Sequence, residues 1–156
     1  MSDPTYINPK DATQGSEGRI PLGLFPETAR LAGALAFKEG QLKYGQYNYR
    51  VAPVSAEVYY SALGRHLAAW WDGQDIDQDS GLPHLWKALA CIAILIDAKA
   101  CGTLTDTRPP SAPTAGMLKD LQPVARRLVA DLQQRYTPCQ YTIADTPQSG
   151  GAEDHG

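Results

Sequence analysis

The apolar run ALACIAILIDA at residues 88–98 is the feature that most limits how this chain can fold. It lies within PHLWKALACIAILIDAKACG, which starts with a proline suited to a first helical turn and stops at Gly102. The run is too short to span a bilayer and carries Asp97, so it is expected to form a helix inside a soluble protein. Because this helix is apolar nearly all round, it should be the most buried one.

Two segments before this run repeat apolar residues at helical spacing. The segment PETARLAGALAFKEGQLKYG, residues 26–45, is predicted to form a helix that stops at Gly45. The segment SAEVYYSALGRHLAAWWDG, residues 55–73, opens with Ser55, a favourable N-cap, and closes with Gly73, a favourable residue just past a helix end. Both segments are therefore expected to be helical.

A fourth helical pattern, residues 114–136, contains Pro123, which is expected to kink the helix or split it in two. Strand patterns do not compete with these helices, although YNYRV at 47–51 alternates and is consistent with a short extended piece. The predicted fold class is therefore all-α, a bundle of about four helices.

The ends of the chain differ in composition from its middle. Residues 1–18 and 137–156 are rich in small and polar residues, so a flexible arm and a disordered tail are predicted around one domain at 19–136. A net charge of −3 argues against binding of polymeric nucleic acid. The start of the chain lacks the apolar segment of a signal peptide, and its three cysteines form no CxxC motif. A cytoplasmic protein is expected.

The loop DGQDIDQDSGLPH, residues 72–84, holds four aspartates and a histidine between two predicted helices. It is not an EF-hand, because counting from Asp75 places Ser80 and Trp86 where that loop needs glycine and glutamate. One interpretation is a polar loop whose carboxylates favour the start of the next helix. The other is a site for a hard cation such as magnesium or manganese, which binds oxygen ligands from such clusters.

A polar line follows one face of the predicted helix 55–73. Its members, four or three residues apart, are Glu57, Ser61, Arg65, Ala68 and Asp72. A solvated face and a functional face are both consistent with this pattern, since apolar residues occupy a separate face of the same helix.

The stretch LKYGQYNYR, residues 42–50, combines cations, an amide and aromatic rings. Lys43 and Arg50 are suited to phosphate, Asn48 to a base edge or sugar, and a tyrosine ring to stacking on a base. A polar turn anchored by tyrosines is the alternative. Arg108 adds a cation in the loop TDTRPP.

The sequence lacks a P-loop, HExxH, GxSxG and GxGxxG, so nothing indicates covalent catalysis. The features that remain as functional candidates are carboxylates, a few cations and a loop suited to a nucleotide. This set favours metal-assisted hydrolysis of a phosphoanhydride.

Four quoted stretches together, GQLKYGQYNYR, YYSALGRHLAAWWDGQDIDQDSGLPHL, ALACIAILIDA and LTDTRPP, resemble the phage dATP/dGTP diphosphohydrolase N-terminal domain family. This family includes MazZ-type enzymes and is grouped with the all-α, MazG-like nucleotide pyrophosphohydrolases. The resemblance covers roughly residues 20–110. It implies hydrolysis of dGTP or dATP to the monophosphate and pyrophosphate with Mg²⁺ or Mn²⁺, in a homo-dimer or homo-tetramer.

The resemblance also implies a setting and a set of site residues. The setting is the bacterial cytoplasm during phage infection, where draining dGTP supplies dGMP for 2-aminoadenine DNA. The matched positions are Lys43, Asn48, Arg50, Arg65, His66, Asp72, Asp77, Ser80, Gly81, His84 and Arg108. The EExxE…ExxD pattern of MazG-like enzymes is absent, so Glu57, Asp75 and Asp97 are metal candidates by charge and placement.

The sequence therefore predicts a dNTP pyrophosphohydrolase, with a non-enzymatic helical nucleotide-binding or regulatory protein as the alternative. The predicted catalytic residues are Asp77, His66 and Asp72; the substrate-binding residues are Lys43, Asn48, Tyr49, Arg50, Arg65 and Arg108; the metal ligands are Asp72, Asp75, Asp77, His84 and Glu57.

Overall fold

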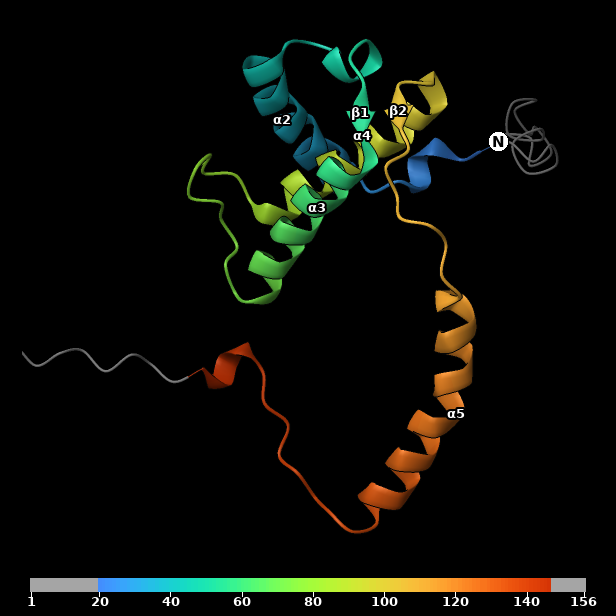
Figure 1. Cartoon of the computed structure of the whole chain (residues 1–156). Helices are drawn as coiled ribbons and strands as arrows, with labels where there is room; N and C mark the ends of the chain where they lie inside the picture. Colours follow the sequence, from blue (N-terminus) through green and yellow to red (C-terminus); the bar gives the residue numbers. More distant parts are fainter. Residues whose placement is uncertain (1–19, 147–156) are drawn as a thin grey trace, which may run out of the picture. The chain divides into compact units, whose positions relative to one another are not determined.

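The structure, a computed structural model, describes residues 20–146 and is all-α, as predicted (Figure 1). Its α-helices in this range are α2 (Glu27–Tyr44), α3 (Ala56–Trp71), α4 (His84–Cys101) and α5 (Thr114–Gln133). Short 3₁₀ turns, labelled η, span Leu22–Leu24, Asn48–Arg50 and Ile143–Asp145, and two short strands are β1 (Val54–Ser55) and β2 (Leu104–Thr105). The predicted arm at 1–18 and residues 147–156 of the predicted tail lie outside the described range.

The chain divides into two compact units, one ending at Asn48 and the other beginning at Tyr49. The first unit contains α2, whose bounds agree with the predicted helix. Glu27 in its first turn pairs with Arg30, which places a negative charge where the helix dipole favours it. The helix stops at Gly45, where φ is 92°.

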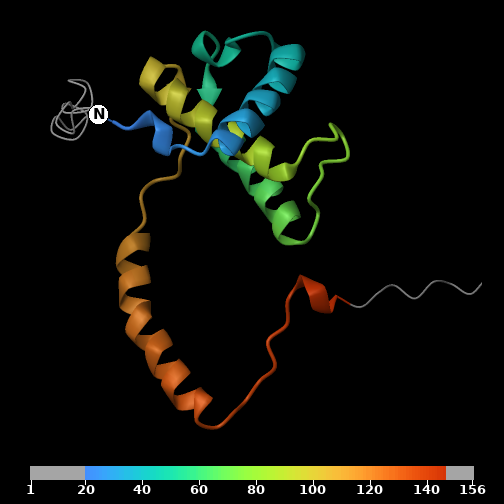
Figure 2. The same cartoon turned by 180° about the vertical axis from the view of Figure 1, so that it is seen from behind.

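In the second unit, α3 and α4 pack against each other as a helical hairpin (Figures 1 and 2). The buried apolar residues of α4 are small, namely Ala88, Ala90 and Ala98, and small residues let packed helices approach closely. Together with His84, these residues make α4 the described helix with the most buried positions, which confirms the prediction from the apolar run. Its end at Gly102, in the left-handed region with φ 75°, was also predicted.

One end of the hairpin is closed by β1 and β2, which pair in parallel with Val54 opposite Leu104. Ser55 is the N-cap residue of α3, as predicted, but its side chain makes no capping hydrogen bond. Instead the Thr107 hydroxyl accepts a hydrogen bond from the Glu57 backbone N–H at 2.8 Å and lies 3.1 Å from the Ser55 hydroxyl. A residue far along the chain thus satisfies a donor at the helix start.

The alternation of residues 47–51 had suggested an extended segment. Instead, this stretch contains the 3₁₀ turn Asn48–Arg50. Tertiary contacts hold this turn. The Arg50 guanidinium donates to both Asp97 carboxylate oxygens, at 2.9 and 2.8 Å, and lowers the pKa of Asp97. The Thr103 hydroxyl donates to the Tyr49 carbonyl at 2.7 Å. These contacts tie the turn to the end of α4.

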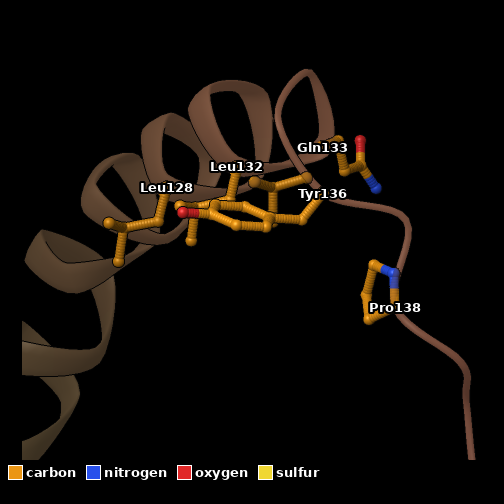
Figure 3. A pocket seen from close by; sticks show the side chains of 6 residues that line it. Leu128, Leu132, Gln133, Tyr136 and Pro138 are labelled. Atoms are coloured by element: carbon orange, nitrogen blue, oxygen red, sulfur yellow. The ribbon is translucent and has the colours of Figure 1, made fainter.

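Helix α5 runs continuously through Pro123, so of the two predicted effects of this proline, a kink or a split, the split does not occur. All its residues are exposed, so water can satisfy the carbonyl that a proline leaves without its helical partner. Its apolar side chains include Leu121, Val124, Leu128 and Leu132. Near its end this apolar side forms an open pocket, where the Tyr136 ring lies along the helix surface (Figure 3).

Two further observations concern membrane-spanning helices and the cysteines. Between residues 20 and 146, none of the helices has the length and apolar character needed to cross a bilayer. The cysteines Cys91, Cys101 and Cys139 are free thiols, and burial of Cys91 within α4 raises the pKa of its thiol.

Replacing Thr107 with alanine should destabilise the fold, because it removes the acceptor for the backbone N–H at the start of α3. Loss of an N-terminal helix cap costs about 0.5–2 kcal/mol of unfolding free energy. Urea denaturation of Thr107→Ala should show this loss. The Ser55→Ala variant should lose less unfolding free energy, because the Ser55 side chain makes no capping hydrogen bond. An equal loss in both variants would contradict the assignment of Thr107 as the cap.

Candidate metal centre

The loop between α3 and α4 folds back on itself and turns one of its four aspartates inward. Ile76 and Pro83 form an isolated antiparallel bridge. Beside it, the Asp77 N–H donates to the Leu82 carbonyl at 2.9 Å, and the His84 N–H donates to the Asp75 carbonyl at 2.8 Å. These bonds fix Asp77 directly opposite the start of α4.

A tight turn within the loop is built on Asp77 itself. The Gly81 N–H donates to the Asp77 carbonyl at 2.7 Å, and the Asp79 N–H donates to the Asp77 Oδ1 at 2.9 Å. Gly81 has φ 71°, a left-handed conformation that a residue with a Cβ adopts only at a cost. Gly81 therefore allows the tight turn, and the turn orients the Asp77 carboxylate.

His66, Asp77 and His84 form a group of metal-type donors, hereafter the His–Asp–His cluster. One donor atom from each residue lies within 4.8 Å of the others. His66 comes from the inward face of α3, His84 from the first position of α4, and Asp77 from the loop between them. The two imidazole Nδ1 atoms are 2.9 Å apart, and His84 is buried, with 9% of its surface exposed.

The geometry of this cluster fits a divalent cation. Ligand atoms about 2.1 Å from a shared ion and at right angles to each other lie about 3.0 Å apart. The 2.9 Å between the imidazole nitrogens is a hydrogen-bonding distance and is also close to this spacing. The carboxylate must move inward from its present position to join them. Two imidazoles with one carboxylate suit a transition metal that binds nitrogen ligands better than they suit magnesium.

Lys87, one turn into α4, completes the cluster and was not predicted from the sequence. Its ammonium donates to the Asp77 carboxylate and, at 3.2 Å, to the Ser80 hydroxyl. Both side chains of the pair are mostly buried, with 17% of Lys87 and 13% of Asp77 exposed. The hydrogen bond from Lys87 lowers the pKa of Asp77, so the carboxylate is ionised at neutral pH.

The pKa of His66 is also lowered, mainly because partial burial disfavours the imidazolium and secondarily because Lys87 and His84 lie nearby. The ring is therefore neutral at pH 7, which is the form that donates a lone pair to a metal or accepts a proton. His66, predicted to be catalytic, thus lies beside two predicted metal ligands.

The other predicted metal residues lie outside the cluster. Asp72 and Asp75 are exposed in the same loop, and Glu57 is exposed at the opposite end of α3. The polar line of α3, from Glu57 through Arg65 to Asp72, is exposed throughout, and the inward face of the helix holds Leu63 and His66 instead. This exposure is compatible with both interpretations of the line, a solvated face and a functional face.

Three of the four predicted substrate-binding cations contact a carboxylate. Lys43 pairs with Glu39 within α2, Arg50 pairs with Asp97, and Arg108 pairs with Asp106. The hydrogen bond from Arg108 lowers the pKa of Asp106 to about 2.

Two further predicted substrate residues, Asn48 and Tyr49, are half-buried in the 3₁₀ turn. Lys43 and Asn48 belong to the first unit, whereas Tyr49, Arg50, Arg65 and Arg108 belong to the second.

Comparison with known proteins gives one match. A family model described as "dATP/dGTP diphosphohydrolase, N-terminal" matches residues 9–108, nearly two thirds of the chain. The matched range includes α2, α3, the acidic loop and α4, and it ends before α5. Neither a curated protein nor a solved structure matches the chain.

The stability of the metal-free protein should depend on the protonation of His66. Its pKa is lower in the folded protein than its ordinary value of 6.5, so the unfolded chain binds a proton more readily. The unfolding free energy should therefore fall as the pH drops from about 6.5 through the folded-state pKa. Urea denaturation with a chelator present should show this fall, and His66→Gln should reduce it. An identical pH dependence in the two proteins would contradict the desolvation of His66.

Proposed function

Because this chain belongs to the dATP/dGTP diphosphohydrolase N-terminal family, we propose that it hydrolyses purine deoxynucleoside triphosphates with the help of a divalent cation. The products are the deoxynucleoside monophosphate and pyrophosphate. The observation that carries this proposal is the His–Asp–His cluster, which lies within the segment matched by the family model. His66, Asp77 and His84 would hold the cation.

The cation, when bound, neutralises phosphate oxygens and increases the electrophilicity of the phosphorus. The reaction itself is a displacement at the α-phosphorus. A water oxygen forms the new bond, the bond from the α-phosphorus to the bridging oxygen breaks, and pyrophosphate leaves with the bond electrons. The proton of the water passes to a carboxylate, for which Asp72 and Asp75, exposed in the same loop, are our candidates.

The cluster is built on rigid elements, which supports a role in positioning. His66 and His84 lie on two packed helices, and Asp77 is held by both backbone and side-chain hydrogen bonds. A reaction that has little covalent chemistry for the protein to perform depends mainly on such positioning and on charge. The two imidazole nitrogens of the donor set favour a transition-metal ion over Mg²⁺.

The candidate residues for the nucleotide are those predicted from the sequence, some in the first unit and some in the second. Lys43, Arg50, Arg65 and Arg108 supply positive charge for phosphate, and Asn48 and Tyr49 supply an amide and an aromatic ring for the base or sugar. Arg50 and Arg108 already contact Asp97 and Asp106, so phosphate would have to compete with these carboxylates. The biological setting that fits this activity is remodelling of the nucleotide pool in a phage-infected bacterium, with dGMP supplied for 2-aminoadenine DNA.

Self-association is part of the same proposal. Several large apolar side chains of the hairpin are exposed in a single chain, among them Trp71 at 80% and Ile96 at 66%. Monomeric proteins rarely leave so much apolar surface in water, and identical copies commonly cover it in symmetric dimers or tetramers.

Replacing Asp77 with asparagine should abolish the reaction. The amide keeps the shape of the side chain but removes the charge that a divalent cation requires, so release of pyrophosphate from dGTP with Mn²⁺ should fall by at least about a hundredfold. The variant should also lose about 1–3 kcal/mol of stability, because Lys87 remains partly buried without its ionic partner.

The matched control for this experiment is Asp79→Asn, which changes an exposed aspartate of the same loop and should keep its activity. Equal activity in Asp77→Asn and the wild type would rule out Asp77 as a ligand. Binding of dGTP by the wild type without any release of pyrophosphate would favour the alternative of a non-enzymatic nucleotide-binding protein.

The purified protein should behave as a dimer or tetramer in multi-angle light scattering, with a mass at least twice the 16.9 kDa of one chain. A charge placed on the exposed apolar surface, as in Ile96→Glu, should weaken this association because it would be buried without a partner. A monomeric wild type at micromolar concentration would reject the proposal of self-association.

A further inference from the structure

The Lys87 ammonium supplies positive charge directly beside Asp77. It contacts the Asp77 carboxylate and the Ser80 hydroxyl, inside the loop that forms the His–Asp–His cluster. We propose that Lys87 is a substitute cation, which neutralises Asp77 while the site lacks metal and moves to a substrate phosphate once metal binds Asp77. This inference rests on the proposed function. It adds Lys87 as a phosphate-binding residue and a competition between Lys87 and the metal for Asp77.

The first step in the argument is the cost of a buried charge. Only 13% of the Asp77 side chain is exposed, and an ionised carboxylate in such a place is unfavourable unless it is paired. The Lys87 side chain, of which only 17% is exposed, is the group that contacts this carboxylate. Lys87 supplies that charge and keeps the loop in place before metal arrives.

The second step concerns the oxygen atoms of Asp77. Oδ1 accepts the hydrogen bond from the Asp79 N–H that shapes the turn, and Oδ2 accepts the hydrogen bond from Lys87. The cation and Lys87 would therefore compete for Oδ2, if the turn is to stay intact. Two positive groups at adjacent positions also repel each other. Bound metal thus expels the ammonium from its present position.

The third step is the destination of the ammonium. Lys87 lies in the first turn of α4, and its flexible four-carbon side chain lets the head group move without the helix. A lysine ammonium acts as a mobile point charge toward phosphate. The triphosphate is bound next to the cation in the proposed reaction, so the expelled ammonium meets a negative partner close to its starting point.

These steps predict opposite effects from one substitution. Without the Lys87 ammonium, Asp77 has no competitor for the cation, so Mn²⁺ should bind more tightly. The same change removes a contact to phosphate, so the nucleotide should bind more weakly. A lysine that only stabilises the loop would, when removed, weaken the binding of both ligands together.

The test measures Mn²⁺ and nucleotide binding separately, without turnover. Free Mn²⁺ is titrated by electron paramagnetic resonance, and a dGTP analogue with a methylene group between the α- and β-phosphorus is titrated at saturating Mn²⁺. For Lys87→Met we expect the Kd for Mn²⁺ to fall about fivefold or more and the Kd for the analogue to rise about tenfold, in line with the loss of one charge-assisted contact. Lys99→Met, which changes an exposed lysine of the same helix, should alter neither value.

Lys87→Gln is a second variant, in case Lys87→Met fails to fold. Its amide can still donate hydrogen bonds to Asp77 and Ser80 but carries no charge. Thermal denaturation checks that both variants fold. Tighter Mn²⁺ binding with weaker analogue binding in the folded variants supports the inference. Unchanged or weaker Mn²⁺ binding overturns the competition, and unchanged analogue binding overturns the transfer to phosphate.

The proposed function is tested separately within the same titrations. If Asp77→Asn abolishes Mn²⁺ binding while the Lys87 variants behave like the wild type, the cluster binds metal and the inference about Lys87 alone is wrong. If the wild type binds no Mn²⁺, or if Asp77→Asn binds it as the wild type does, both the metal role of the cluster and the inference are overturned.

Discussion

A carboxylate that is mostly withdrawn from water is the constraint on which the described site depends. Asp77 remains ionised there because the Lys87 ammonium pairs with it, while its other oxygen accepts the N–H of the loop turn. Its backbone carbonyl and N–H bind Gly81 and Leu82. One residue thus shapes the loop and presents a charge to the two histidines. Without this pairing, keeping the carboxylate ionised in this partly buried position would cost free energy.

The opposite end of the α3–α4 hairpin provides the rigidity that a metal centre needs. There the parallel pairing of β1 with β2, the Thr107 cap and the Arg50–Asp97 ion pair join segments far apart in the sequence. With that end fixed, and with small alanines allowing close helix packing, the register of α3 against α4 is set. That register places the two imidazoles within 2.9 Å of each other. Sites carried by packed helices hold their geometry better than sites carried by loops alone.

Much of the fold could be predicted because its signals are local. Apolar spacing and the glycines at 45 and 102 gave the helices and their ends, and the acidic loop indicated the neighbourhood of the site. The sequence could not show which of four aspartates faces inward, since that depends on the turn around Gly81. Nor could it pair His66 with His84, which lie 18 residues apart and meet only through helix packing.

Other features were missed because distant residues decide them. The Thr107 hydroxyl, and not the Ser55 side chain, accepts the hydrogen bond at the start of α3. Contacts with Asp97 and Thr103 hold residues 48–50 in a 3₁₀ turn instead of an extended segment. Lys87 had one signal, a lone charge close to the start of a nearly all-apolar helix, which marks a residue that needs a buried partner.

The measurement that tests the central claim most directly is the anomalous diffraction of a crystal grown with Mn²⁺ and the methylene analogue of dGTP. The account predicts an anomalous peak about 2.1–2.2 Å from nitrogen atoms of His66 and His84 and from an Asp77 oxygen, with the Lys87 ammonium displaced from Asp77. A peak on other residues, or none while the ion pair of Asp77 and Lys87 stays intact, would contradict it.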